Sequence, residues 1–459
     1  MPLAMLLAVA ALPADYLSNW MGALAPAIND LSILDISLPG THDTLTYDLS
    51  TTISDGANDI SPALAWVLHE LGPIIGIAKV GQFIRSQAQT QWLDITAQLD
   101  NGLRFVDFRT MYTAGPDSGS LGAHDWYGLH LVQTNTKSMV YLTQIRDWLI
   151  AHPTEVIAIW FSRHGSECAK GNDQYPDVTP AVKQAFWAEI KSLFGALVFD
   201  RSGSLGRLNS TTVGRMIAAG RRVVFYATDH AEFTGNDTTV YDACGQLSNT
   251  LSGGDLDNVA GAVQGLRGEF AGAAAKRARL KAADQLYLVS MGGAPPEDVV
   301  KASAEIFYLP FERSKYEASC AAALHIPNLT SWCPVTLLDA VQLRNYYLQA
   351  ALDATAAGDA AGLPSLQPPG AIYLDALDTN GSIRTGEQTA TTAATWASGT
   401  TSYAYVDTLL YFNARVGCSA AARNASACTT LLAALQARRA LRPLKKWVDA
   451  EHGRLASWP

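Results

Sequence analysis

Short runs of apolar, β-branched and aromatic residues recur along the chain and alternate with stretches of helical periodicity. Several of these runs, such as EVIAIWFS at residues 155–162, are apolar on both faces, which is typical of strands buried under helices in a parallel sheet. Between residues 139 and 153 the apolar positions repeat every three or four residues, as on one face of a helix. Strands are predicted at residues 34–38, 103–109, 155–162, 221–228, 285–290 and 371–377.

The alternation of strands and helices over 459 residues predicts an α/β protein. This length suits a (β/α)8 barrel with long insertions, and a doubly wound sheet is the alternative. No GxGxxG sequence follows any predicted strand, so a dinucleotide-binding sheet has no supporting motif. The expected organisation is a secretory signal or N-terminal helix at residues 1–25, a barrel at 26–385 with insertions at 45–90 and 230–280, and a linker with a helical C-terminal extension at 386–459.

The composition indicates a folded, well-buried protein, with 48% hydrophobic and 16% charged residues. A net charge of −9 and the lack of a dense Lys/Arg cluster argue against a nucleic-acid partner. A basic helical stretch at residues 434–453 could lie on an anionic lipid surface. A solvated helix face packed on the domain explains this stretch more simply, and we favour that interpretation.

Three features suggest an oxidising compartment. The first 14 residues have the apolar core and small-residue end of a secretory signal, although no Lys or Arg precedes them. The 6 cysteines form no CxxC pair, so disulfides are expected rather than a zinc site. Closed loops are expected at Cys320–Cys333 and Cys418–Cys428. Glycosylation acceptors of the Asn-x-Ser/Thr type, which support a secreted glycoprotein, occur at Asn209, Asn236, Asn328, Asn380 and Asn424.

Ionisable side chains gather at the ends of the predicted strands, where the active sites of α/β barrels lie. Taken singly, each has a structural explanation; Asp107 and Arg109, for example, form an Asp-x-Arg pair on one strand face that could be a salt bridge. Their joint placement at successive strand ends predicts one catalytic rim. The candidates are His42, Asp43, Asp107, Arg109, His130, Arg163 and Asp375.

Three sequence motifs occur in a specific order and spacing. They are SLPGTHD from Ser37, the pattern QLxxGLRFxDxR from Gln98, and the pattern HPxEVI from His152. Together they resemble the X domain of phosphatidylinositol-specific phospholipases C, clearly over residues 30–165 and more loosely to the strand at 370–378. The resemblance implies a distorted TIM barrel, in agreement with the pattern of strands and helices.

In this family the inositol 2-hydroxyl attacks the phosphodiester phosphorus, expels diacylglycerol and leaves a cyclic phosphate. The resemblance implies that His42 is the general base and His130 the general acid, because imidazole titrates near neutral pH. Arg109 would hold the phosphoryl oxygens through its planar, permanently charged fork. Asp43 and Asp375 would orient the histidine and the arginine.

Three further positions are less closely defined. Asp107 is expected to anchor the substrate or Arg109, and Arg163 is a candidate for substrate binding only. His124, six residues before His130, is an alternative general acid. The strand-like alternation around His130, and its distance from the following helix, favour His130.

The resemblance also addresses metal binding. Animal-type members bind Ca²⁺ with an Asn directly after the first histidine and with acidic residues at both positions of the second strand. This chain has Asp43 at the first of these positions and Arg109 at the last. A guanidinium is unsuited to the oxygen shell of a hard cation. We therefore expect no metal and no other cofactor, as in the bacterial-type branch of the family.

The sequence thus predicts a secreted, metal-independent phosphodiesterase that cleaves an inositol phospholipid or a glycosyl-inositol anchor at a membrane surface. A monomer without a nucleic-acid partner is expected. One alternative is a metal-dependent glycerophosphodiester phosphodiesterase, which would need a Glu-x-Asp pair where this chain has Asp107 and Arg109. The other alternative is a catalytically silent barrel that binds lipid or glycan.

Overall fold

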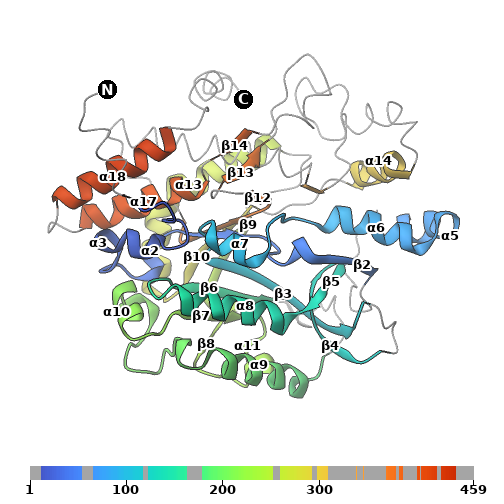
Figure 1. The fold of residues 1–459 in the computed structure, drawn as a ribbon, viewed down its shortest axis with the longest axis horizontal. Coiled ribbons are helices and arrows are strands. Elements are labelled where there is room, and N and C mark those ends of the chain that lie inside the picture. Colours follow the sequence, from blue (N-terminus) through green and yellow to red (C-terminus); the bar gives the residue numbers. More distant parts are fainter. Residues whose placement is uncertain are drawn as a thin grey trace, which may run out of the picture.

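The computed structural model places β-strands at the centre of the molecule and helices around them (Figure 1). Arg163 and the expected Cys320–Cys333 pair lie outside the residues that the structure describes. Those residues are 12–53, 66–116, 122–162, 178–251, 259–291, 297–308, 337–338, 345, 369–378, 382–385, 401–403, 405–420 and 425–440.

Parallel strands form the core of the fold, in the order of a (β/α)8 barrel. From edge to edge this order is β8, β7, β6, β3, β1, β11, β10 and β9, and every neighbouring pair is parallel. Within the described residues β8 and β9 do not pair, so the barrel is distorted at this point, and the predicted fold class is confirmed. The strands are β1 (Leu38–Thr41), β3 (Phe105–Ala114), β6 (Ile157–Ser162), β7 (Val223–Ala227), β8 (Val240–Asp242), β9 (Leu247–Leu251), β10 (Leu286–Ser290) and β11 (Ala371–Leu374).

Helices cover the outer face of the sheet. On β6, Ile159 and Phe161 point outward and pack in one apolar cluster with residues of α8 and α9. Ala158 and Trp160 point the other way, into a second cluster inside the barrel. Strand side chains alternate between the two faces, so an apolar strand such as β6 supplies both layers.

The predicted helix at residues 139–153 is confirmed as α8. Among the described helices, none combines the length and the apolar character that crossing a bilayer requires. The helices on the sheet and between strands are α7 (Ile95–Asp100), α8 (Ser138–Ala151), α9 (Pro180–Phe194), η5 (Gly195–Leu197), η6 (Leu208–Ser210), α10 (Val213–Ala218), α11 (His230–Thr234), α12 (Ala243–Gln246), α13 (Val259–Ala282) and α14 (Glu297–Tyr308).

Antiparallel strands extend the sheet beside the C-terminal end of β3. β3 pairs with β4, β4 with β5, and β5 with β2. α6 packs against β2 and β5, so the predicted insertion at residues 45–90 forms one wall next to this end of the barrel. The elements are η3 (Thr46–Asp48), β2 (Leu49–Ile53), η4 (Val67–Leu71), α5 (Gly72–Ile75), α6 (Ile77–Ala88), β4 (His124–His130) and β5 (Val132–Lys137), and a separate small sheet contains β12 (Leu377–Asp378), β13 (Ser382–Thr385) and β14 (Thr401–Tyr403).

Two predictions from the sequence are wrong in detail. The first strand occupies residues 38–41 rather than 34–38, because a capping box between Ser32 and Asp35 forms the short helix η2 (Ile33–Asp35) instead. Gly40 lies inside this strand, where a Cβ would come within 2.7 Å of the Cβ of Tyr373. Residues 230–280 are more than an insertion, since they contain the barrel strands β8 and β9.

A buried ion pair joins the N-terminal helices to the barrel. Arg104 Nη2 lies 2.7 Å from Glu155 Oε2, and both side chains are fully buried. Glu155 also accepts hydrogen bonds from the backbone N–H groups of Met21 and Gly22 in α2 (Trp20–Ala23). This segment, which continues into α3 (Ala25–Ile28), is therefore part of the packed fold.

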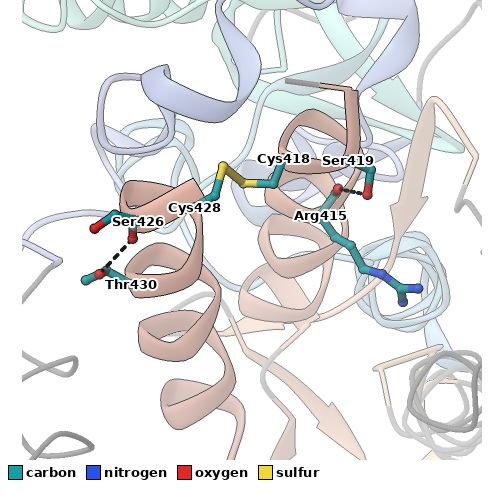
Figure 2. Close-up of a disulfide and its surroundings, with 6 residues drawn as sticks. All are labelled: Arg415, Cys418, Ser419, Ser426, Cys428 and Thr430. Carbon is teal, nitrogen blue, oxygen red and sulfur yellow. Dashed lines mark hydrogen bonds between the residues drawn. A yellow bond between two sulfur atoms is a disulfide. The ribbon is translucent and has the colours of Figure 1, made fainter. Parts of the chain in front are cut away.

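The predicted C-terminal helical extension is present as α17 (Tyr405–Ala420) and α18 (Ala425–Ala440), which lie beside α2 and α3 in Figure 1. Asn413 Oδ1 accepts a 2.6 Å hydrogen bond from the backbone N–H of Ser37, just before β1. Figure 2 shows the disulfide between Cys418 and Cys428, which joins the two helices as predicted. Closing a loop of this length stabilises the fold by roughly 3 kcal/mol in the chain-entropy account.

Candidate active site

The site begins at the turn that follows β1. The backbone N–H of His42 donates to Leu374 O at 2.8 Å and so extends the pairing of β1 with β11 by one residue. Asp43 then adopts a positive φ of 48°, a conformation that Asp tolerates better than most residues, and its N–H donates to Asp107 Oδ2 at 3.0 Å. This sharp turn directs the two consecutive side chains into the mouth of the barrel.

His42 is held at both ring nitrogens. Its Nδ1 lies 2.8 Å from Asp375 Oδ1, and its Nε2 lies 2.7 Å from Arg109 Nη2. A carboxylate can only accept and a guanidinium can only donate, so the proton is on Nδ1 and the lone pair is on Nε2. That tautomer makes Nε2 the basic nitrogen.

The pKa of His42 reflects opposing influences. Burial lowers it, and the nearby carboxylates of Asp43 and Asp375 raise it, while Arg109 lowers it further. The carboxylates prevail, and the pKa of His42 is raised above 6.5. A base of this kind holds a proton more tightly than free imidazole does.

Arg109 is fixed between two buried carboxylates. Its Nε lies 2.5 Å from Asp43 Oδ1 and 3.2 Å from Asp107 Oδ2. β3 places Asp107 and Arg109 two residues apart on the same face, so the arginine side chain folds back over its own strand. The result is a preorganised positive charge beside the Nε2 of His42.

His130 stands at the end of β4, on the other side of Asp43. Its Nδ1 donates to Ala88 O at 2.6 Å and lies 3.3 Å from Asp43 Oδ2, so the hydrogen of this ring nitrogen is already engaged. The imidazole centroids of His130 and His42 are 6.3 Å apart. His124 lies at the opposite, exposed end of the same strand, so the structure brings His130 and not His124 to the cluster.

Two polar residues that sequence reasoning missed support the turn. Thr90 Oγ1 and Gln91 Nε2 each donate to His42 O at 2.9 Å, and Gln91 Nε2 also donates to Leu374 O at 3.0 Å. They fix the backbone of His42 against β11. Both stand in the loop between α6 and α7, and nothing in its sequence separates them from ordinary loop residues.

The residues of the sequence motifs have different tasks in the structure. Gln98, the first residue of the second motif, accepts from Thr41 Oγ1 at 2.7 Å and donates to Thr44 O at 3.0 Å, and so holds the turn that carries His42. Arg104 and Glu155 come from the same motifs, but they form the buried ion pair near the N-terminal helices. These two residues stabilise the fold and do not face the site.

The cluster contains the atoms of a cation site together with a group that opposes one. Within the described residues, ligand atoms of His42, Asp43 and Asp107 lie within 4.8 Å of one another. Arg109 contacts all three of these side chains, so a hard cation would have to displace the guanidinium before it could take up oxygen ligands. The residues present therefore do not fit a resident metal.

Comparison with known proteins shows similarity to one family over part of the chain. Residues 75–243 match the family described as PI-PLC X 1, a range that contains Asp107, Arg109 and His130. PI-PLC X domain-containing protein 1 of Mus musculus is 33% identical over 150 residues, which are 33% of this chain and 40% of that protein. The Homo sapiens protein of the same name is 31% identical over 183 residues, which are 40% of this chain and 50% of that protein.

The chain thus spans half or less of the length of these relatives. The expected resemblance to the PI-PLC X family is confirmed. Among solved structures, phosphatidylinositol-specific phospholipase C of S. aureus gives a TM-score of 0.45 with 14% identity, over 86% of this chain and 97% of that one. The phosphatidylinositol-specific phospholipase C of Listeria monocytogenes gives 0.40 with 15% identity, over 78% and 93%.

Proposed function

We propose that this protein is a phosphatidylinositol-specific phospholipase C-like phosphodiesterase that works without a metal. The observation that carries the proposal is one partly buried cluster that contains two imidazoles and a guanidinium fixed by carboxylates. His42 and His130 supply a base and an acid, and Arg109 supplies positive charge beside His42. Cleavage of a phosphodiester by an internal hydroxyl requires these three functions.

The proposed reaction starts with the inositol 2-hydroxyl beside His42. Nε2 of His42 takes the hydroxyl proton while the oxygen forms a bond to phosphorus. The bond from phosphorus to the glycerol oxygen breaks, and Nε2 of His130 gives a proton to that oxygen, which leaves as diacylglycerol. Inositol cyclic phosphate is the other product. Acid and base catalysis each contribute roughly 10²- to 10⁴-fold.

Arg109 has a second task in this scheme. In the structure its Nη2 contacts the lone pair on His42 Nε2, while its Nε stays with Asp43. Substrate binding would replace the contact between Arg109 and His42. The inositol hydroxyl would then donate to Nε2 of His42, and the guanidinium of Arg109 would donate to a phosphoryl oxygen. Asp43 and Asp107 then keep the arginine in place, and Asp375 keeps His42 in the basic tautomer.

An inositol phospholipid at a membrane surface is the proposed substrate. Ile74, in the helix before α6, is 78% exposed, and Trp92, next to the supporting Gln91, is 39% exposed. Large apolar side chains that face water on the wall beside a site suit contact with a lipid surface. We further propose that the protein is secreted, because the disulfide between Cys418 and Cys428 suits an oxidising compartment. We also propose that it acts as a monomer.

The experiment separates the acid from the base by leaving group. His130→Ala should lose most of its activity on phosphatidylinositol but keep it on a nitrophenyl ester of inositol phosphate, because nitrophenolate leaves without a proton. His42→Ala should lose activity on both substrates. His124→Ala is the matched control and should behave as wild type. Equal losses for His130→Ala on the two substrates would contradict its role as general acid.

A further inference from the structure

The loop between α6 and α7 bridges the two strand ends that carry the proposed base and its carboxylate. The side-chain amide of Gln91 donates to His42 O at 2.9 Å and to Leu374 O at 3.0 Å. Its Oε1 accepts from the backbone N–H of Leu377 at 3.3 Å. One side chain therefore contacts the backbone of His42 and the backbone on both sides of Asp375.

The backbone turn at Asp375 depends on the same loop. Ala376, the next residue, has a φ of 59°, a left-handed conformation that alanine rarely adopts. Its backbone N–H donates to Thr90 O at 2.7 Å. Thr90 and Gln91 thus hold a turn that its own residues do not favour, and this turn brings the carboxylate of Asp375 to His42.

The amide of Gln91 is fully buried, so water cannot take over its hydrogen bonds. The two carbonyl groups that it contacts have a second donor each. His42 O also accepts from Thr90 Oγ1, and Leu374 O also accepts from the backbone N–H of His42. Loss of the amide should therefore shift the two strand ends against each other without unfolding the barrel.

We propose that Gln91 is a positioning residue that sets the distance between Nδ1 of His42 and Oδ1 of Asp375. This inference rests on the proposed function. The two atoms are 2.8 Å apart, and a relative shift of the two strand ends would lengthen this hydrogen bond. A catalytic group misplaced by about 1 Å can lose roughly 10²-fold in rate. Gln91 acts through the backbone of His42 and not on the substrate.

Turnover separates positioning from stability. Gln91→Met keeps the length of the side chain and removes the amide. It should lower kcat for phosphatidylinositol about 10²-fold with little change in KM, since the base is displaced and the substrate contacts remain.

Asn413 provides the matched control. It is a second buried amide that bonds to the backbone of one residue, Ser37, just before the other end of β1. Asn413→Leu should lower the melting temperature, as Gln91→Met does, and retain the wild-type kcat. A wild-type kcat in Gln91→Met, or an equal loss of kcat in both variants, would overturn the proposal.

The pKa of His42 provides a readout that does not depend on turnover. Burial lowers this pKa, and Asp43 and Asp375 raise it to a net value above 6.5. A longer contact with Asp375 should therefore lower the pKa in Gln91→Met, and the pKa should stay unchanged in Asn413→Leu. Both variants keep the other charged or titratable groups that face His42, which are Asp43, Asp107, Arg109, His130 and Tyr373.

NMR of ¹³C-labelled histidine across a pH series measures this pKa, with the signal of His42 assigned by its absence in His42→Ala. If wild type cleaves no phosphatidylinositol, the proposed function fails and this measurement alone decides the role of Gln91. A lower pKa in Gln91→Met than in wild type and Asn413→Leu would support the proposal. An unchanged pKa in Gln91→Met would overturn it.

Discussion

Replacing Asp375 by asparagine removes one negative charge from the contact that orients His42 and leaves the shape of the side chain almost unchanged. Asp375 is buried, and its Oδ1 lies 2.8 Å from His42 Nδ1. A hydrogen bond to a charged group contributes about 1.5–3 kcal/mol, which corresponds to about 10- to 150-fold in rate if the bond strengthens as His42 gains its proton. An asparagine amide can also donate to Nδ1, which would move the proton to Nε2 and remove the base.

We therefore expect Asp375→Asn to reduce kcat for phosphatidylinositol by about 10²- to 10⁴-fold, the range that a general base contributes. Asp125→Asn, at an exposed ion pair with Lys137, is the matched control and should retain activity. The assay is release of inositol cyclic phosphate, followed by ³¹P NMR across a pH series.

The pH dependence of activity tests whether Asp375 raises the pKa of His42. Burial lowers the pKa of His42, but Asp43 and Asp375 raise it to a net value above 6.5, so wild-type activity should fall as the pH drops through that raised value. In Asp375→Asn one raising influence is absent, and the acidic limb should move to lower pH. A raised pKa also stabilises the fold below about pH 6.5, and this contribution is lost as the pH rises through the folded value. An Asp375→Asn variant with wild-type kcat and an unchanged acidic limb would refute the reasoning.

Two further substitutions separate catalysis from stability. Arg109→Lys keeps the charge but loses the planar fork between Asp43 and Asp107, and should lower kcat by about 10²- to 10³-fold with little change in the melting temperature. Steady-state kinetics and calorimetry together check this, and a near-normal kcat would count against it. Arg104→Met leaves the carboxylate of Glu155 buried without its partner and should destabilise the fold by about 3–5 kcal/mol, measured by urea unfolding. A loss below 1 kcal/mol would show that the pair is dispensable.

The outline of the fold could be predicted because its main strands are strongly apolar. β3, β6, β7 and β11 all appear within two residues of where the pattern begins them. β8 and β9 could not be predicted in this way, since VYD has only three residues and LSNTL is largely polar. The first strand was displaced because Pro39 and Gly40 usually end a strand, whereas here close packing against Tyr373 requires the glycine.

The site, too, could be predicted only in part from the sequence. His42 and Asp43 follow β1, and Asp107 and Arg109 lie where the parallel pairing of β3 with β6 ends, so their convergence followed from the order of the elements. The supporting residues could not be found from the sequence. Thr90 acts through its hydrogen bond to a backbone carbonyl, and no periodicity records such a contact.

The central claim is that His42 is the base of a metal-independent phosphodiesterase. Its most direct test is hydrolysis of phosphatidylinositol micelles in excess EDTA by wild type and by His42→Ala. We predict chelator-resistant release of inositol cyclic phosphate by wild type and a loss of about 10²-fold or more in the variant. Activity that returns only with added Ca²⁺ or Mg²⁺, or equal rates for the two proteins, would contradict it.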